Sequence, residues 1–314
     1  MDTRSRIGRA CVTLAVIALT VVFVKPAFAA DKEVIPSVSA PGYKPAAVNA
    51  NAKMVGAESC ASCHAETAEK FGKTFHGRKV LSHPKLGNSC EACHGAGSAH
   101  VDGGGDIALI TNPKKLDAAA ASELCLTCHK EKTLTMWKTG SHATNAVSCT
   151  SCHNVHETTD RKNLAKGGTE TCYTCHKQQK ADMRLSSHHP VPEGKMTCVS
   201  CHNPHGGIEG NLKWDSKQET CLKCHGDKAG PFAYEHPPVT DDCMNCHKPH
   251  GSSSERLLKQ NMPNLCLSCH RQPHSATRGG GGQGLSLTVI QQRGRCYDCH
   301  NQIHGSDRKP GLKD

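Results

Sequence analysis

The chain has 314 residues, a net charge of +10, 21 cysteines and 22 histidines, while aromatic residues make up 4% of it and hydrophobic residues 36%. This apolar content is too low to fill the core of an ordinary globular domain of this length. The positive charge is not accompanied by any nucleic-acid-binding motif, so no nucleic-acid partner is expected.

The N-terminal residues 1–29 have the features of a secretory signal peptide. Three arginines precede an apolar run at residues 11–24, and Ala27-Phe28-Ala29 forms an A-x-A cleavage site. The run is shorter than the about 20 residues that span a membrane, which argues against the alternative of a membrane anchor. Residues 30–57 have no helical or strand period and are expected to form an extended N-terminal arm, which either contacts a partner or is disordered. The mature protein is therefore expected in the periplasm.

The central feature of the sequence is the motif Cys-x-x-Cys-His, which occurs ten times and is the attachment signature of c-type haem. Residues three and four apart share one face of a helical turn. Both thiols can then reach the vinyl groups of one porphyrin, and the histidine lies under the iron as its proximal ligand. Zinc ribbons and disulfides also use Cys-x-x-Cys pairs, but neither needs a histidine after every second cysteine. Ten covalently bound haem c groups are predicted.

The motifs use every cysteine except Cys11, which lies in the predicted signal peptide. The covalent attachment residues are Cys60, Cys63, Cys90, Cys93, Cys125, Cys128, Cys149, Cys152, Cys172, Cys175, Cys198, Cys201, Cys221, Cys224, Cys243, Cys246, Cys266, Cys269, Cys296 and Cys299. The proximal iron ligands are His64, His94, His129, His153, His176, His202, His225, His247, His270 and His300.

Ten further histidines alternate with the motifs, one after each, and are the candidate distal ligands. They are His76, His100, His142, His156, His189, His205, His236, His250, His274 and His304. Bis-histidine ligation leaves no vacant position on the iron, which indicates electron transfer and no catalytic residue. His83 and His188 lie outside the pattern, although His188 could exchange roles with its neighbour His189.

The spacing of the distal candidates predicts how the sites are linked. A histidine three residues after a proximal one cannot reach the opposite face of the same haem, so His156, His205 and His250 are expected to ligate neighbouring haems. The sequence therefore predicts three copies of one two-haem unit, at residues 125–156, 172–206 and 221–251. Such a one-dimensional repeat grows as a rod.

The predicted fold class is a multihaem cytochrome c. It is mostly irregular coil with short α-helices wrapped around ten stacked haems, elongated, with almost no β-sheet. After the signal peptide and the arm, residues 58–190 are expected to form a first pentahaem half and residues 191–314 a second.

Several segments resemble the periplasmic decahaem cytochromes of the MtrA and DmsE type, which include relatives in iron-oxidising bacteria. The matching segments are His142-Ala143 before Cys149, Lys180-Ala181-Asp182-Met183 before His189, and residues 198–206, 235–240 and 302–306. The resemblance runs from about Gly56 to the C-terminus and includes all ten candidate distal histidines.

This resemblance implies an elongated electron conduit inside an outer-membrane β-barrel porin. Its expected partners are that porin, periplasmic or inner-membrane cytochromes, and an extracellular cytochrome or terminal reductase. The external chemistry would be Fe(II) oxidation, metal-oxide reduction or reduction of another acceptor such as dimethyl sulfoxide. Two alternatives remain open: a multihaem reductase with one open haem, and a soluble periplasmic electron shuttle.

Overall fold

A computed structural model describes residues 51–80, 90–130, 134–157, 162–270 and 295–313. All of them belong to one compact unit, Pro36–Asp314. The predicted signal peptide, most of the predicted arm, His83 and His274 lie outside the described residues. The division into two pentahaem halves at residue 190 stays a prediction.

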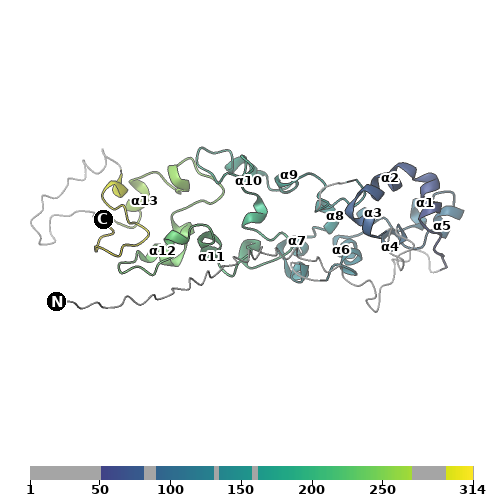
Figure 1. Cartoon of the computed structure of the whole chain (residues 1–314), viewed down its shortest axis with the longest axis horizontal. Coiled ribbons are helices and arrows are strands. Elements are labelled where there is room, and N and C mark those ends of the chain that lie inside the picture. Colours follow the sequence, from purple (N-terminus) through teal and green to yellow (C-terminus); the bar gives the residue numbers. More distant parts are fainter. Residues whose placement is uncertain (1–50, 81–89, 131–133, 158–161, 271–294, 314) are drawn as a thin grey trace, which may run out of the picture. The chain divides into compact units, whose positions relative to one another are not determined.

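The described chain consists of short helices joined by irregular backbone, as Figure 1 shows, and this confirms the predicted fold class of short helices without a sheet. Where the structure describes the chain, strand pairing is limited to isolated bridges. No helix in these ranges is both long and apolar enough to cross a membrane.

The helices are distributed along the whole described chain. The α-helices are α1 (Ala57–Cys63), α2 (Ala65–Lys73), α3 (Phe75–Val80), α4 (Glu91–His94), α5 (Ser98–Asp102), α6 (Ala118–Leu126), α7 (Ser141–Thr144), α8 (Cys149–Cys152), α9 (Thr169–Tyr173), α10 (Lys177–Asp182), α11 (Lys217–Leu222), α12 (Pro237–Asp241) and α13 (Asn264–Leu267). The 3-10 helices are η1 (Ile107–Leu109), η2 (Pro113–Lys115), η4 (Trp137–Thr139), η5 (Cys198–Ser200), η6 (Glu209–Asn211), η7 (Gly226–Lys228), η8 (Cys243–Asn245), η9 (Glu255–Leu257) and η10 (Cys296–Asp298).

Each haem-binding motif forms one helical turn, as its sequence predicts. In all ten motifs the backbone N–H of the histidine donates to the carbonyl of the first cysteine, at 2.9–3.1 Å. Polar residues before the motifs start several of these turns. Ser148 and Thr197 form capping boxes at motifs 4 and 6, and the Asp242 side chain accepts from the N–H of Met244 at motif 8. The thiols and the histidine of each motif are thereby held on one turn.

Few apolar side chains are buried within the described residues. They are Ala121, Trp137, Tyr173, Met183, Val191 and Leu258. Some aromatic rings lie beside histidines, since the Trp137 ring is 6.3 Å from that of His205 and the Phe71 ring 6.0 Å from that of His156. At least these two aromatic side chains, Trp137 and Phe71, therefore lie beside the histidine pairs.

The buried carboxylate of Glu91, in the second motif, is hydrogen-bonded to the backbone at the start of the described chain. Glu91 is 1% exposed and accepts hydrogen bonds from the backbone N–H groups of Val55, Gly56 and Gly97, at 2.8–2.9 Å. Because a buried carboxylate is stable only when its oxygens are hydrogen-bonded, this residue fixes how the chain enters α1.

Candidate haem sites

Nine proximal histidines each lie opposite one predicted distal histidine within the described residues. The distances between ring centroids fall between 5.8 and 6.3 Å. In motif order the pairs are His64 with His100, His94 with His156, His129 with His76, His153 with His205, His176 with His142, His202 with His250, His225 with His189, His247 with His304 and His270 with His236.

These distances fit one iron atom between each pair of rings. A bond of about 2.0 Å from metal to imidazole nitrogen, plus roughly 1.1 Å from ring atom to centroid, places two opposite imidazole centroids about 6.2 Å apart. Rings in direct stacking contact would be closer than this. The side chains therefore fit the bis-histidine haem geometry that the motifs predict.

The pairing alternates in direction along the chain. At motifs 3, 5, 7 and 9 the distal histidine comes from upstream, from the segment that follows the motif two earlier. At motifs 2, 4, 6 and 8 it comes from downstream, from directly after the motif two later. His156, His205 and His250 each face a proximal histidine that lies beyond one intervening motif in the sequence.

The first and last motifs depart from this rule. His64 pairs with His100, from the segment after motif 2. His300 of motif 10 is the proximal histidine that remains. The remaining candidate distal histidine, His274, lies outside the described residues and stays a prediction.

At the even-numbered motifs, a backbone carbonyl further along the chain binds the proximal histidine through Nδ1. The distances are 2.6–2.9 Å. The pairs are His94 with Thr111, His153 with Lys162, His202 with Gly210, His247 with Arg256 and His300 with Gly311. Because a carbonyl only accepts, Nδ1 carries the proton and Nε2 keeps its lone pair for a metal.

The residue after the acceptor carbonyl is left-handed at four of these sites. Asn163, Asn211, Leu257 and Leu312 have φ between 51° and 57°. Asparagine tolerates this conformation, whereas a leucine is destabilised by about 1–2 kcal/mol. Such local strain is typical of functional positions. The left-handed conformation turns the preceding carbonyl toward the proximal histidine.

At motifs 1, 5, 7 and 9, the hydrogen bond is made by the distal histidine instead. Nδ1 of His100, His142, His189 and His236 bonds to the carbonyls of Asp106, Pro204, Pro249 and Ile303, at 2.7–3.2 Å. At motif 3, Nδ1 of His76 meets the side-chain amide of Asn163 at 3.0 Å. Within the described residues, each pair thus has one ring fixed through Nδ1, and the sequence carries no signal for this alternation.

Burial keeps many of these histidines in the neutral form that metal ligation requires. Burial lowers the pKa of His205 to about 4. It is also the main cause of the lowered pKa of His76, His129, His156, His236, His247, His250 and His304.

Cysteines of consecutive motifs lie close together and connect the motifs in sequence order. The first cysteines meet in the pairs Cys60/Cys90, Cys125/Cys149, Cys172/Cys198, Cys221/Cys243 and Cys266/Cys296. The second cysteines approach one another in the pairs Cys93/Cys128, Cys152/Cys175, Cys201/Cys224 and Cys246/Cys269. Burial and the neighbouring Cys90 thiol, for example, raise the pKa of Cys60 to about 11. Each motif from 2 to 9 therefore has one thiol near a thiol of the preceding motif and one near a thiol of the following motif.

His188 has a different environment from its neighbour His189. Its ring bonds to Glu193 at 3.0 Å and to the carbonyl of Leu185 at 2.6 Å. The hydrogen bond with Glu193 raises the pKa of His188. His189, in contrast, faces His225, so the geometry separates two histidines that the sequence left interchangeable.

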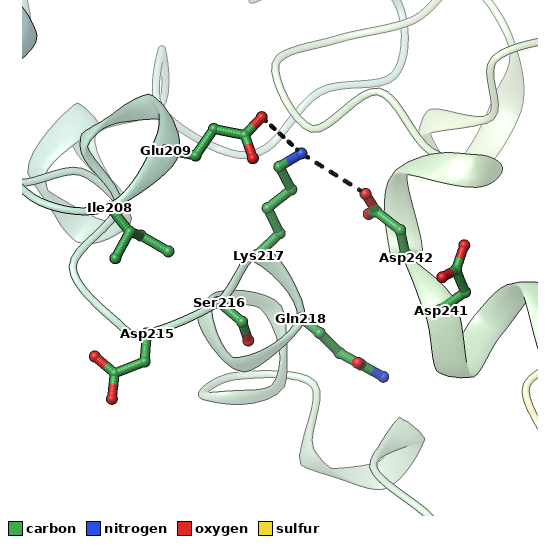
Figure 2. A pocket seen from close by; sticks show the side chains of 8 residues that line it. All are labelled: Ile208, Glu209, Asp215, Ser216, Lys217, Gln218, Asp241 and Asp242. Atoms are coloured by element: carbon green, nitrogen blue, oxygen red, sulfur yellow. Dashed lines mark ion pairs between the residues drawn. The ribbon is translucent and has the colours of Figure 1, made fainter.

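A polar pocket lies outside the histidine pairs, where η6, α11, α12 and η8 meet. Lys217 extends between Glu209, at 3.0 Å, and Asp242, at 3.9 Å, as Figure 2 shows. Asp215 and Asp241 complete its acidic lining. The lysine thus joins the segment after motif 6 to motif 8, and both carboxylates are partly exposed, so these ion pairs are weak.

Comparison with known proteins identifies the family. A model of a doubled CXXCH motif matches residues 188–230 and 236–274, and an NrfB-like c-type cytochrome model matches residues 90–167. The chain is 38% identical over 268 residues to the multihaem cytochrome MtrA of Shewanella baltica, covering 82% of this chain and 80% of the relative. It belongs to the MtrA family of multihaem c-type cytochromes.

Membership of the MtrA family makes the chain an electron-carrying cytochrome with several covalently bound haems. A second relative, the c-type cytochrome protein NrfB of Escherichia coli, is 30% identical over 105 residues, which are 32% of this chain and 54% of the relative. The match to NrfB is local, whereas the match to MtrA extends over most of the chain.

Proposed function

We propose that this chain is a decahaem cytochrome that conducts electrons across the outer membrane inside a porin complex. When bound, haem supplies reversible one-electron chemistry at each site. The protein supplies two imidazoles per site and keeps the iron closed to substrates. The observation that carries the proposal is the set of nine histidine pairs whose spacing fits one iron each.

The contacts between successive motifs support a conduit over a store of separate sites. Close first-cysteine pairs alternate with second-cysteine pairs that approach one another, and together they follow the motifs in sequence order from motif 1 to motif 10. A path that passes from each motif to the next in sequence order favours an extended arrangement with the first and last sites far apart.

The need for a porin follows from the nature of the backbone. Irregular chain facing lipid would leave peptide groups without hydrogen-bond partners, which costs several kcal/mol for each group. A chain of this kind needs a closed protein sheath to cross a bilayer. The family relationship with MtrA and the predicted signal peptide support a periplasmic protein that enters such a sheath. The expected electron partners are periplasmic or inner-membrane cytochromes on one side and an extracellular cytochrome or terminal reductase on the other.

Co-purification from outer membranes tests this proposal. The native chain, isolated with a mild detergent, is expected to bring a large β-barrel protein with it in a fixed ratio. Recovery of the haem-loaded chain only in the aqueous periplasmic fraction would favour the soluble shuttle.

Magnetic resonance of the oxidised protein tests the enzyme alternative. All sites are expected to be low-spin, since every proximal histidine has a predicted partner. A high-spin component, together with rapid binding of carbon monoxide after reduction, would instead favour a reductase with one open haem.

A further inference from the structure

Three short segments with the pattern x-His-Gly follow motifs 6, 8 and 10. They are Pro204-His205-Gly206, Pro249-His250-Gly251 and Ile303-His304-Gly305. The histidine of each segment faces the proximal histidine of an even-numbered motif, namely His153 of motif 4, His202 of motif 6 and His247 of motif 8. The histidine pair at motif 4 is called site 4, and the other pairs are numbered in the same way. Each segment thus already supplies one candidate ligand.

The residue before the histidine contributes to a second, odd-numbered site. The carbonyls of Pro204 and Pro249 accept from Nδ1 of His142 and His189, both at 2.7 Å, and the carbonyl of Ile303 accepts from Nδ1 of His236 at 3.2 Å. One dipeptide therefore presents an imidazole to site 4, 6 or 8 and a carbonyl to the distal ligand of site 5, 7 or 9.

The glycine allows the segment that carries the odd-site ligand to come close. A Cβ added at Gly206 would lie 2.6 Å from the carbonyl oxygen of Met136, which is six residues before His142. A Cβ at Gly251 would collide with the carbonyl of Asp182, at the end of α10. Both glycines are buried. A side chain at either position would push the two segments apart and lengthen the carbonyl–imidazole bond.

The corresponding segment after motif 4 provides a natural contrast. Val155-His156-Glu157 has an exposed glutamate in place of the glycine. Among the described residues the carbonyl of Val155 makes no bond to His76, whose Nδ1 meets Asn163 instead. His156 still faces His94. This segment thus supplies a candidate ligand to site 2 but no carbonyl to the distal histidine of site 3.

The odd-site rings that Pro204 and Pro249 hold are strongly inclined to their partners. The ring planes make an angle of 75° between His142 and His176 and of 55° between His189 and His225. At sites 2, 4, 6 and 8 the angles are 15–30°. At sites 1 and 9, whose distal rings also donate to carbonyls, the angles are 15° and 23°. A carbonyl bond combined with a steep angle is therefore particular to the segments after motifs 6 and 8. A hydrogen bond at Nδ1 sets the rotation of a ligating imidazole about its metal bond.

We propose that the x-His-Gly segments after motifs 6 and 8 are positioning elements that serve two haem sites at once. The histidine supplies the distal ligand of site 4 or 6, and the carbonyl before it holds the distal imidazole of site 5 or 7 at a steep angle. This inference rests on the proposed bis-histidine assignment, but it is independent of the porin, so the two proposals fail separately.

Magnetic resonance of the oxidised holoprotein tests the proposal directly. Nearly parallel imidazole planes separate the two π-type d orbitals of a low-spin iron and give a rhombic signal. Steeply inclined planes leave these orbitals nearly degenerate and give a strongly anisotropic signal. Sites 3, 5 and 7, with angles of 56°, 75° and 55°, should form the anisotropic class.

The variants Gly206→Ala and Gly251→Ala keep every ligand histidine, and Glu157→Ala is the matched control. Each glycine variant is expected to remove one of the three sites from the anisotropic class, while intact mass shows an unchanged number of haems. The control should leave the spectrum unchanged. Spectra of both glycine variants identical to that of the native protein would overturn the proposal, as would an equal change in the control.

A second pair of variants covers the case in which a glycine variant fails to fold. Pro204→Gly releases the φ angle that proline fixes and leaves both neighbouring histidines in place. Val155→Gly introduces a glycine at the corresponding position of the contrasting segment. The anisotropic signal is expected to lose site 5 in the first variant and nothing in the second. An unchanged spectrum in Pro204→Gly, with the haem number intact, would refute the role of Pro204 in holding its carbonyl against His142.

Discussion

Replacing one of two adjacent histidines gives a sharp test of the ligand assignment. His189 faces His225 with ring centroids 6.3 Å apart, and its Nδ1 donates to the Pro249 carbonyl. His188 instead bonds to Glu193 and the Leu185 carbonyl at the surface. We therefore expect His189→Gln to open one site and His188→Gln to open none.

The size of the effect follows from the number of sites. The haem at motif 7 stays attached through its two thioether bonds, so His189→Gln should convert about one tenth of the total iron to the high-spin form. The reduced variant should bind one carbon monoxide per chain. The lost bond to Pro249 should lower the stability by about 1 kcal/mol.

Magnetic resonance and a carbon monoxide titration measure both outcomes. Because His188 could swing toward the opened site, the double variant His188→Gln/His189→Gln is compared with His189→Gln. A high-spin signal in His188→Gln alone, or a fully low-spin spectrum in the double variant, would refute the assignment of His189 to the site at motif 7.

Three further predictions concern the haem number, the N-terminal clamp and the particle shape. The intact mass of the mature holoprotein should exceed that of the polypeptide by ten haems, and eight or fewer would contradict the motif assignment. Glu91→Ala should destabilise the holoprotein by about 3 kcal/mol in denaturant unfolding, because three backbone N–H groups lose a buried carboxylate, whereas the exposed Glu58→Ala should change little. Small-angle scattering from the isolated protein should show an extended particle, since the motifs are expected to follow one another in sequence order, and a compact sphere would refute this.

The haem-binding turns could be predicted from the sequence because their chemistry is local. A thiol, a second thiol and an imidazole on one turn require a fixed spacing, and Cys60-Ala61-Ser62-Cys63-His64 shows it directly. The absence of a sheet in the described chain also follows from composition, because few β-branched or aromatic runs are present. Candidate distal histidines could be named because each follows one motif.

The partners of those histidines could not be predicted from spacing alone. His156 lies three residues after His153 but faces His94, and only the path of the backbone between them decides this. The carbonyls that bind Nδ1 carry no side-chain signature either. Asn163 and Asn211 give a weak hint, since asparagine tolerates the left-handed conformation, but Leu257 and Leu312 adopt it against their preference.

The alternating direction of ligand supply predicts an order of maturation for a chain that is exported as the predicted signal peptide indicates. Translocated from its N-terminus, the chain already contains His76, His142, His189 and His236 when motifs 3, 5, 7 and 9 emerge. Motifs 2, 4, 6 and 8 emerge before their partners and must wait for a stretch that is still on the other side of the membrane. A chain that stalls between motifs 7 and 8 would have both histidines at its seventh site but only one at its sixth. Incomplete even-numbered sites would therefore mark a partly exported chain.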